Sequence, residues 1–290
     1  MRFSIIIPNL NSPLIHRTIE ALLPQCHGDA EVLVVGLDEL GLVKDSSYVR
    51  FVSTGSPVFP ATARNIGIRL ARGEIFCFLD ADCIPYTDWL ARIKRWFDNP
   101  DIDVLGGGVD TPVTDYWMLA DHISAFHDYL VTSPPGTRQQ LPSLNLVVRR
   151  SALERVGNFD EQRPVGEDSD LTTRLRLHGY TLYFDPHVVV NHIPNRRTAS
   201  VVLQHAKKHG YHSIKIDPRW RSTLRSPLPL RYPFLLLLTT PLLALAVTVA
   251  IYCSNQAIWR WWYVAPAVFM TKIAWCRGAL EKMQQYSEAR

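Results

Sequence analysis

The chain has few cysteines and none of the spacings that give cysteine a structural role. Its 290 residues include five cysteines, an odd number, with no Cys-x-x-Cys pair. A disulfide framework joins cysteines two by two, and structural zinc sites take them at short, fixed spacings. The sequence therefore argues against both arrangements and fits a catalytic part that lies in the reducing cytoplasm.

The N-terminus lacks a long hydrophobic run. The apolar stretch before Pro8 is shorter than the hydrophobic core of a signal peptide. We therefore expect the chain to start in the cytosol and to make any membrane contact through its other end.

Acidic residues are scarce in the last third of the chain. Residues 196–290 carry 14 Lys and Arg against 3 Asp and Glu, whereas residues 1–195 carry 17 against 24. A basic segment beside a long apolar run fits a membrane with anionic lipid. A tail that binds nucleic acid would be basic without that apolar run, so we expect no nucleic-acid partner.

The first half of the chain alternates short apolar strands with helices. The pattern predicts strands over residues 3–7, 31–35, 48–52 and 75–79 and helices over 13–23 and 64–72. Further on it predicts strands over 102–105 and 144–148, helices over 115–130, 151–156 and 169–177, and a polar loop over 131–140. Continuous apolar strands between helices predict an α/β fold with a mixed, mostly parallel sheet flanked by helices. Ligands of such sheets bind at the carboxyl ends of the strands.

The C-terminal part contains a membrane candidate. Residues 232–256 carry no charge over 25 positions, more than the 20 or so that cross a bilayer, although two prolines interrupt the run. A second apolar segment begins at a cluster of Trp and Tyr, and basic residues flank the pair. We expect a two-helix hairpin, about 233–253 and 259–276, with the catalytic domain on the cytoplasmic face. A single span and a buried helical subdomain are the alternatives.

Asp80 and Asp82 follow the apolar strand that ends at Leu79. Two carboxylates two residues apart at a strand end can face one ligand, and hard cations such as Mg²⁺ or Mn²⁺ prefer oxygen. The pair therefore suits a metal ion that bridges a nucleotide diphosphate. A solvated acidic loop is the plainer explanation, and the buried strand before the pair favours the metal.

Arg64 and Asn65 belong to the segment PATARNIG. Arg64 offers a permanent charge to a diphosphate and Asn65 a neutral hydrogen-bonding group. The start of an ordinary amphipathic helix would explain the same residues.

Two further segments carry candidate groups. In GEDSDL, the adjacent carboxylates Glu167 and Asp168 could hold and deprotonate an acceptor hydroxyl, although acidic residues also favour a helix start through its dipole. His192 follows an apolar strand and could be a third metal ligand through a neutral imidazole. A lone histidine is more often structural.

Taken in order, these segments resemble a known family. SIIIPNLN, ARNIG, DAD, a Gly-rich strand, NLVVRR, VGNFDE, GEDSDL and VVVNH occur in one order over residues 3–195. The chain resembles a family 2 glycosyltransferase with the GT-A fold. The resemblance implies donor-binding residues Pro8, Asn9, Asp38, Arg64, Asn65, Asp80, Ala81 and Asp82, and the catalytic carboxylates Asp168, as the base, and Glu167. It also implies a Mn²⁺ or Mg²⁺ ion on Asp80, Asp82 and His192.

The resemblance has two departures. Most members of that family carry paired aspartates after the second strand, where this chain has Gly36 and Leu37, so Asp38 is the candidate for the nucleobase contact. Processive members carry Gln-x-x-Arg-Trp, and here Ile216 precedes Arg219-Trp220 in place of Gln. We therefore expect transfer of a single sugar.

The predicted organisation has three parts. A catalytic domain covers 1–197, with a nucleotide-sugar half over 1–105 and an acceptor half over 106–197. A basic amphipathic membrane-surface segment follows over 198–230, and a membrane region over 231–290. The resemblance implies an inverting transfer from a nucleotide sugar, with a UDP-sugar favoured and a GDP-sugar possible. The acceptor would be a lipid-linked saccharide, a polyprenyl phosphate or a glycolipid, and membrane lipids would be partners. Two other hypotheses compete with this one. The chain could be an inactive membrane-bound binding or scaffold protein, or it could be an aspartyl phosphatase.

Overall fold

The computed structural model describes residues 1–111, 115–213 and 232–288. The chain divides into two compact units, Met1–Thr111 with Tyr129–Ile193, and Pro112–Asp128 with Pro194–Arg290. Residues 112–128, which the sequence places inside the catalytic domain, thus group with the C-terminal segments. The Arg219-Trp220 pair lies outside the described residues.

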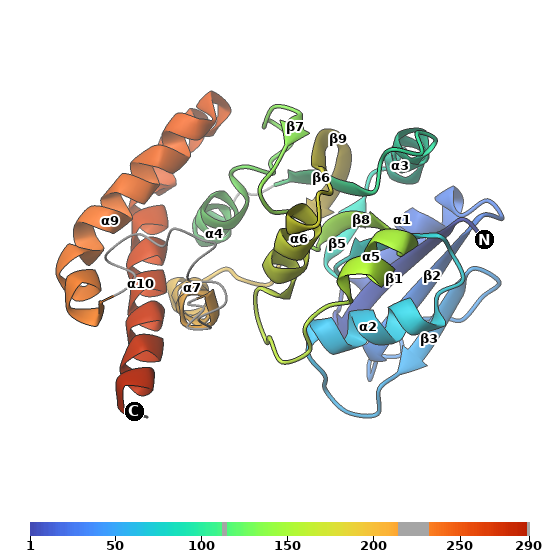
Figure 1. Cartoon of the computed structure of the whole chain (residues 1–290), viewed down its shortest axis with the longest axis horizontal. Coiled ribbons are helices and arrows are strands. Elements are labelled where there is room, and N and C mark those ends of the chain that lie inside the picture. The colour runs from blue at the N-terminus through green and yellow to red at the C-terminus, as the bar shows by residue number, and fades with distance from the viewer. Residues whose placement is uncertain (112–114, 214–231, 289–290) are drawn as a thin grey trace. The chain divides into compact units, whose positions relative to one another are not determined.

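The first unit is built on one mixed sheet (Figure 1). Its described strands are β1 Phe3–Leu10, β2 Ala30–Leu37, β3 Val49–Ser53, β4 Ile75–Leu79, β5 Cys83–Pro85, β6 Val104–Asp110, β7 Gly136–Thr137, β8 Asn145–Arg149 and β9 Leu182–His192. They lie in the order β3-β2-β1-β4-β8-β6-β9-β5, with β7 beside β9. The run β3-β2-β1-β4 is parallel, and so is the pair β6–β9, whereas β8 is antiparallel to both of its neighbours.

Helices cover the sheet. Those of this unit are α1 Ile15–Leu22, α2 Pro60–Leu70, α3 Trp89–Phe97, α5 Arg150–Val156 and α6 Glu167–Leu177, with a 3₁₀ turn η1 at Leu23–Gln25. α2, α5 and α6 share one apolar core with the sheet, to which Phe76 and Phe78 of β4 contribute fully buried rings. α1 contacts β5 and α3 contacts β9. The carboxyl ends of β1, β2 and β4 therefore meet at one edge, where the predicted site residues gather.

The structure confirms the predicted fold class and shifts some boundaries. α2 begins at Pro60, before the predicted Arg64, because proline fits the first turn of a helix, where the missing N–H is not needed. The predicted loop 131–140 contains β7, which pairs with β9. The Arg138 guanidinium beside it lies 4.3 Å from the centre of the Phe184 ring.

The second unit is helical. It contains α4 Tyr116–Phe126, α7 Ala199–Ser213, α9 Pro233–Ser254, the 3₁₀ segment η3 Gln256–Val264 and α10 Ala265–Glu288. Among the described helices, only α9 is long and apolar enough to cross a membrane. The second predicted span, about 259–276, falls in η3 and the first half of α10, and it stays a prediction.

Gly36 allows β1 and β2 to meet closely at the site edge. It pairs with Asn9 across the two parallel strands and has a φ of 140°, a conformation that only glycine adopts readily. A Cβ at this position would fall onto the carbonyl oxygen of Asn9. An aspartate therefore does not fit at residue 36 on this backbone.

We predict that Gly36→Ala lowers the free energy of unfolding by about 3 kcal/mol or more, because backbone strain and a steric clash add. Gly28→Ala is the matched control, since Gly28 has a φ of 78° but no atom within 4 Å of an added Cβ. The control should lose only about 1–2 kcal/mol. Urea denaturation measures both, and equal losses would show that the approach to Asn9 is not limiting.

Candidate active site

A pocket lies at the carboxyl ends of β1, β2 and β4. Its volume is about 230 Å³. It is lined by Pro8, Asn9, Leu10, Ser12, Gly36, Leu37, Thr54, Val58, Pro60, Ala63, Asp80, Ala81 and Asp82. Five predicted donor-binding residues, Pro8, Asn9, Asp80, Ala81 and Asp82, thus line the same pocket.

Arg64 joins the two halves of the site. From α2, its Nη2 donates to Asp80 Oδ1 at 2.6 Å and its Nη1 to Glu167 Oε1 at 2.7 Å. The Arg64 side chain is only 3% exposed, so the surroundings screen these charges weakly. The ion pairs connect the strand tip after β4 with the start of α6, 103 positions away from Arg64 in the chain.

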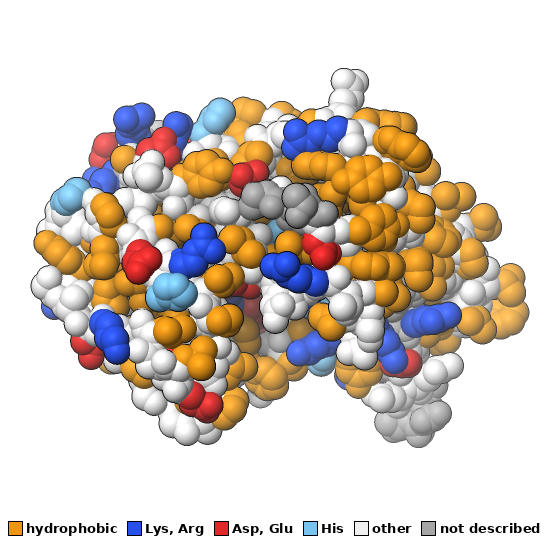
Figure 2. Space-filling model, turned by 180° about the vertical axis from the view of Figure 1, so that it is seen from behind, with side chains coloured by type: hydrophobic (Ala, Val, Ile, Leu, Met, Phe, Trp, Pro, Cys, Tyr) orange, Lys and Arg blue, Asp and Glu red, His pale blue; other side chains and the backbone are white. Residues whose placement is uncertain are grey.

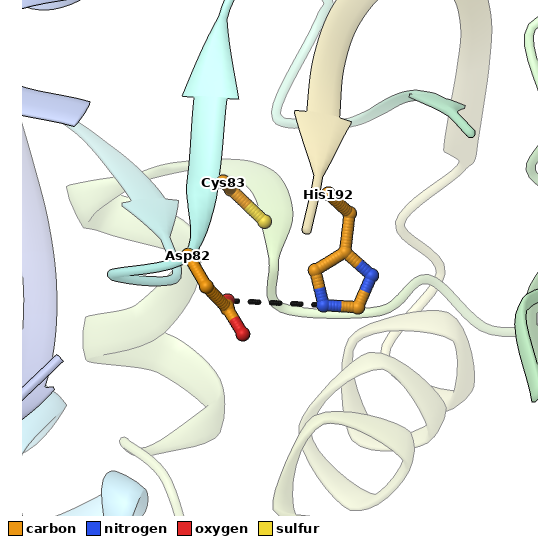
Figure 3. Close-up of side chains that lie close together, drawn as sticks. All are labelled: Asp82, Cys83 and His192. Atoms are coloured by element: carbon orange, nitrogen blue, oxygen red, sulfur yellow. Dashed lines mark ion pairs between the residues drawn. The ribbon is translucent and has the colours of Figure 1, made fainter. Parts of the chain in front are cut away.

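Asp82, Cys83 and His192 form the metal-ligand candidate (Figure 3). Their ligand atoms all lie within 4.8 Å of one another, and His192 Nε2 is 3.7 Å from Asp82 Oδ1. Antiparallel pairing of β5 with β9 sets this arrangement, because Cys83 stands opposite His192 in the register. One divalent cation fits this spacing, with Asp82 and His192 as its oxygen and nitrogen ligands.

Asp80 stands apart from that group. One of its carboxylate oxygens is held by Arg64, although the residue also lines the pocket. The structure thus brings Asp82 and His192 together and directs Asp80 toward Arg64.

Asp168 lies at the start of α6. Its Oδ2 accepts the Ser143 N–H at 3.2 Å and its Oδ1 the Ser169 N–H at 2.6 Å. Burial raises the pKa of this carboxyl, while these N–H groups and the charge of Arg64 oppose the rise. A carboxylate with a raised pKa is a better proton acceptor near neutral pH than an ordinary one.

The remaining predicted residues have other local roles. Asn65 donates to the Phe159 carbonyl at 2.9 Å and accepts the Phe159 N–H at 3.1 Å, so it binds its own scaffold and does not line the pocket. Asp38 Oδ2 accepts the Val43 N–H at 2.7 Å, which closes the loop after β2. Its Oδ1 is buried with no hydrogen-bond partner within the described ranges. Asn9 spans β1 and β2 by donating to the Leu37 carbonyl at 2.7 Å.

The sequence analysis missed Cys83 and the outer pocket wall. Cys83 directly follows Asp82, but only the register of β5 with β9 places it beside His192. Thr54 and Val58 line the pocket from the segment between β3 and α2, which carries no motif. No local sequence pattern marks Cys83 as a neighbour of His192, or Thr54 and Val58 as pocket residues.

Comparison with known proteins identifies the family. Residues 4–157, more than half of the chain, match the family described as Glycosyl transferase family 2. The chain belongs to this family. The chain is similar to the pre-mycofactocin glycosyltransferase of Mycobacterium tuberculosis, 32% identical over 139 residues, and to glycosyltransferase AglE of Haloferax volcanii, 32% identical over 130. These alignments cover 46% and 45% of this chain but only 30% and 43% of the relatives, so the chain spans less than half of their length.

A solved structure shares the fold of this family 2 chain. The mannosyltransferase PcManGT from Pyrobaculum calidifontis, in complex with GDP-Man and Mn²⁺, superposes with a TM-score of 0.56 at 21% identity. The match covers 94% of this chain and 86% of PcManGT. This confirms the predicted GT-A-type architecture.

We predict that Arg64→Met lowers the free energy of unfolding by about 3–5 kcal/mol, because it leaves Asp80 and Glu167 without their cation. The loss should shrink at acid pH, where protonation removes the uncompensated negative charges. Arg2→Met is the control, since its partner Asp98 is 65% exposed and such surface pairs contribute at most about 1 kcal/mol. Urea denaturation measures the free energy of unfolding of both variants. A loss for Arg64→Met as small as that for Arg2→Met would contradict the conclusion that Arg64 holds Asp80 and Glu167 together.

Proposed function

We propose that this chain is an inverting glycosyltransferase that moves one sugar from a nucleotide-sugar donor to a membrane-associated acceptor. The observation that carries the proposal is the Arg64 bridge, which keeps the strand tip of Asp80 beside the start of α6. The candidate base Asp168 follows Glu167 in the chain, so the bridge holds it near Asp80, which lines the proposed donor pocket. Membership of family 2 supports the reaction class.

The pocket beside β1 and β2 is the proposed donor site. Its lining combines Gly36 and Leu37 of β2 with Asp80 and Asp82, which follow β4. We assign the nucleobase end to the Asp38 side, where one carboxylate oxygen is buried without a partner among the described residues. A UDP-sugar is favoured, and the GDP-Man bound to PcManGT supports a GDP-sugar as the second possibility.

Asp82 and His192 are the proposed holders of a Mn²⁺ or Mg²⁺ ion. Their ligand atoms lie 3.7 Å apart and give a mixed oxygen and nitrogen donor set, and Asp82 also lines the pocket. Such an ion, when bound, neutralises the charge that develops on a departing diphosphate. Mn²⁺ in the PcManGT complex supports a divalent ion.

Asp168 is the proposed base. It takes the proton of the acceptor hydroxyl while the acceptor oxygen bonds to the anomeric carbon and the bond from that carbon to the diphosphate oxygen breaks. A single displacement of this kind inverts the anomeric centre. Glu167 then has a positioning role, because it holds Arg64 and through it Asp80. An acceptor phosphate would need no base, so the role of Asp168 applies to hydroxyl acceptors.

We infer the acceptor class from the C-terminal part of the chain. The apolar helix α9 and the basic excess of residues 196–290 support a membrane location, with the catalytic unit facing the cytoplasm. A lipid-linked saccharide, a polyprenyl phosphate or a glycolipid would meet the enzyme there. The activity is tested with purified protein, a panel of nucleotide sugars and Mn²⁺, scored by release of nucleoside diphosphate. Binding without release for every donor would favour an inactive binding protein.

We predict that Asp82→Ala abolishes metal-dependent donor binding, because it removes the oxygen ligand beside His192. Isothermal titration with a nucleoside diphosphate, with and without Mn²⁺, measures this. Asp98→Ala, at an exposed carboxylate, is the control and should bind as the native chain does. If the Asp82 variant bound the nucleoside diphosphate with Mn²⁺ as tightly as the native chain does, Asp82 would not be a metal ligand.

We predict that Asp168→Asn keeps donor binding and lowers kcat for a hydroxyl acceptor by about 10²–10⁴-fold, because the amide cannot accept the proton. In the native chain, kcat should fall as the pH drops through the raised pKa of this carboxyl, since only the deprotonated form is a base. The variant should lose that acid limb of the pH profile. A variant with normal kcat and an unchanged pH profile would show that Asp168 is not the base.

A further inference from the structure

Helix α10 lies directly against α7 in the helical unit. A Cβ at Gly210 of α7 would fall onto the Trp275 carbonyl, and a Cβ at Gly278 of α10 would fall onto the Lys207 carbonyl. Glycine at both positions therefore lets the two backbones touch. The close contact keeps α7, with its charged side chains, beside α10 wherever α10 lies.

The contact between α7 and α10 is lined by charges. Lys207 Nζ lies 2.7 Å from Glu281 Oε1, and both side chains are about half exposed. Next to them, Lys282 Nζ lies 4.6 Å from the centre of the Tyr211 ring, and the Tyr211 hydroxyl donates to Gln285. A charged side chain costs at least about 2.5–3.5 kcal/mol at the centre of a bilayer. This end of α10 is therefore suited to water or to lipid headgroups.

The first half of α10 has polar partners too. Lys272 Nζ donates to the Ser124 carbonyl of α4 at 2.9 Å, and the Thr271 and Ser124 hydroxyls lie 2.8 Å apart. On α4, Asp121 is 4% exposed and accepts from Arg196 at 2.7 Å. From Thr271 to Gln285, α10 thus has polar and charged partners on α4 and α7.

Helix α9 runs back along α10. The two are joined through η3 at one end, and at the other end Leu236 packs among Cys276, Ala279, Leu280 and Met283. The buried positions of α9 form one stripe, Leu236, Thr240, Ala244, Thr248, Ile251 and Tyr252. The opposite stripe is apolar and open, with Leu238 65%, Leu242 70%, Leu245 53% and Val249 53% exposed. Figure 2 shows hydrophobic side chains gathered over this side of the unit.

We propose that α9 lies flat in a membrane surface, with its outer stripe in one leaflet, and does not cross the bilayer. If α9 crossed the bilayer, α10 would lie beside it within the hydrocarbon. Either Lys272 of α10 or the ion pair between Glu281 of α10 and Lys207 of α7 would then be placed among the lipid tails. A flat helix immerses only the apolar stripe. This inference rests on the proposed membrane location and replaces the two-span hairpin with a surface-bound helix.

The surroundings of the stripe fit a lipid surface that carries negative charge. Exposed Trp259, Trp262 and Tyr263 stand at the turn between α9 and α10, next to exposed Arg260. Trp and Tyr concentrate at the headgroup level of membranes. Residues 196–290 carry 14 Lys and Arg against 3 Asp and Glu, which favours anionic lipid over a second copy of the same basic surface.

Nitroxide labels on the full chain test the orientation. In a Cys253→Ser background, single cysteines replace Leu238, Leu242, Leu245 and Val249 in turn, all exposed and all on the outer stripe. Depth is measured by spin-label collision with oxygen and with a water-soluble nickel chelate, on vesicles that contain anionic lipid. A flat helix gives four equal, shallow depths. A crossing helix gives depths that change along the roughly 16 Å between the first and last label.

Controls make each outcome decisive. A label at exposed Gln284 of α10 should stay accessible to the nickel chelate, and burial of that label would overturn the proposal. If the four labels were equally shielded from the nickel chelate without vesicles, and the protein sedimented as a dimer, a second copy of the chain would cover the stripe. That result would also overturn the proposal. The double variant Leu238→Glu and Leu242→Glu should leave vesicles while keeping nucleotide binding. These readouts do not use sugar transfer, so an inactive protein with four shallow depths would defeat the proposed reaction and leave this inference intact.

Discussion

The buried guanidinium of Arg64 is the interaction on which the site depends. It donates to Asp80 after β4 and to Glu167 at the start of α6, with almost no exposure to water. Two carboxylates this close would repel each other in a poorly screened interior, so the cation between them makes their approach favourable. The same charge opposes the rise in the pKa of Asp168 that burial causes. Arg64 thereby holds the two carboxylates together and also lowers the pKa of Asp168 against the effect of burial.

Strand pairing supplies the second constraint. The parallel register of β1 with β2 requires glycine opposite Asn9, and this removes the side chain that an aspartate would place there. The antiparallel register of β5 with β9 sets Cys83 opposite His192, beside Asp82. His192, a candidate metal ligand, is therefore placed beside Asp82 by a strand more than a hundred residues further along the chain. Asp82 belongs both to the pocket lining and to the metal-ligand candidate, so a change in the register of β5 with β9 would alter the surroundings of both.

In the helical unit, polar and apolar contacts lie on different helix faces. α10 meets α4 and α7 through charges and hydroxyls, and α9 covers its remaining side with a narrow stripe of contacts. The outer face of α9 is left apolar and uncharged. Hydropathy alone describes such a helix in the same way as a spanning one, because it records composition and not which neighbour lies alongside.

The sequence by itself determined the fold class, most strand positions and the segments that carry chemistry, because apolar runs and helix periodicity are local properties. It placed Asp80, Asp82 and Ala81 at a strand tip, and the structure puts them in the pocket wall. It did not determine that Asn65 would bind Phe159, that Arg64 would hold Glu167, or that Cys83 would face His192. Those outcomes depend on pairings between residues up to 109 positions apart, which only the folded chain brings within hydrogen-bond or ligand distance.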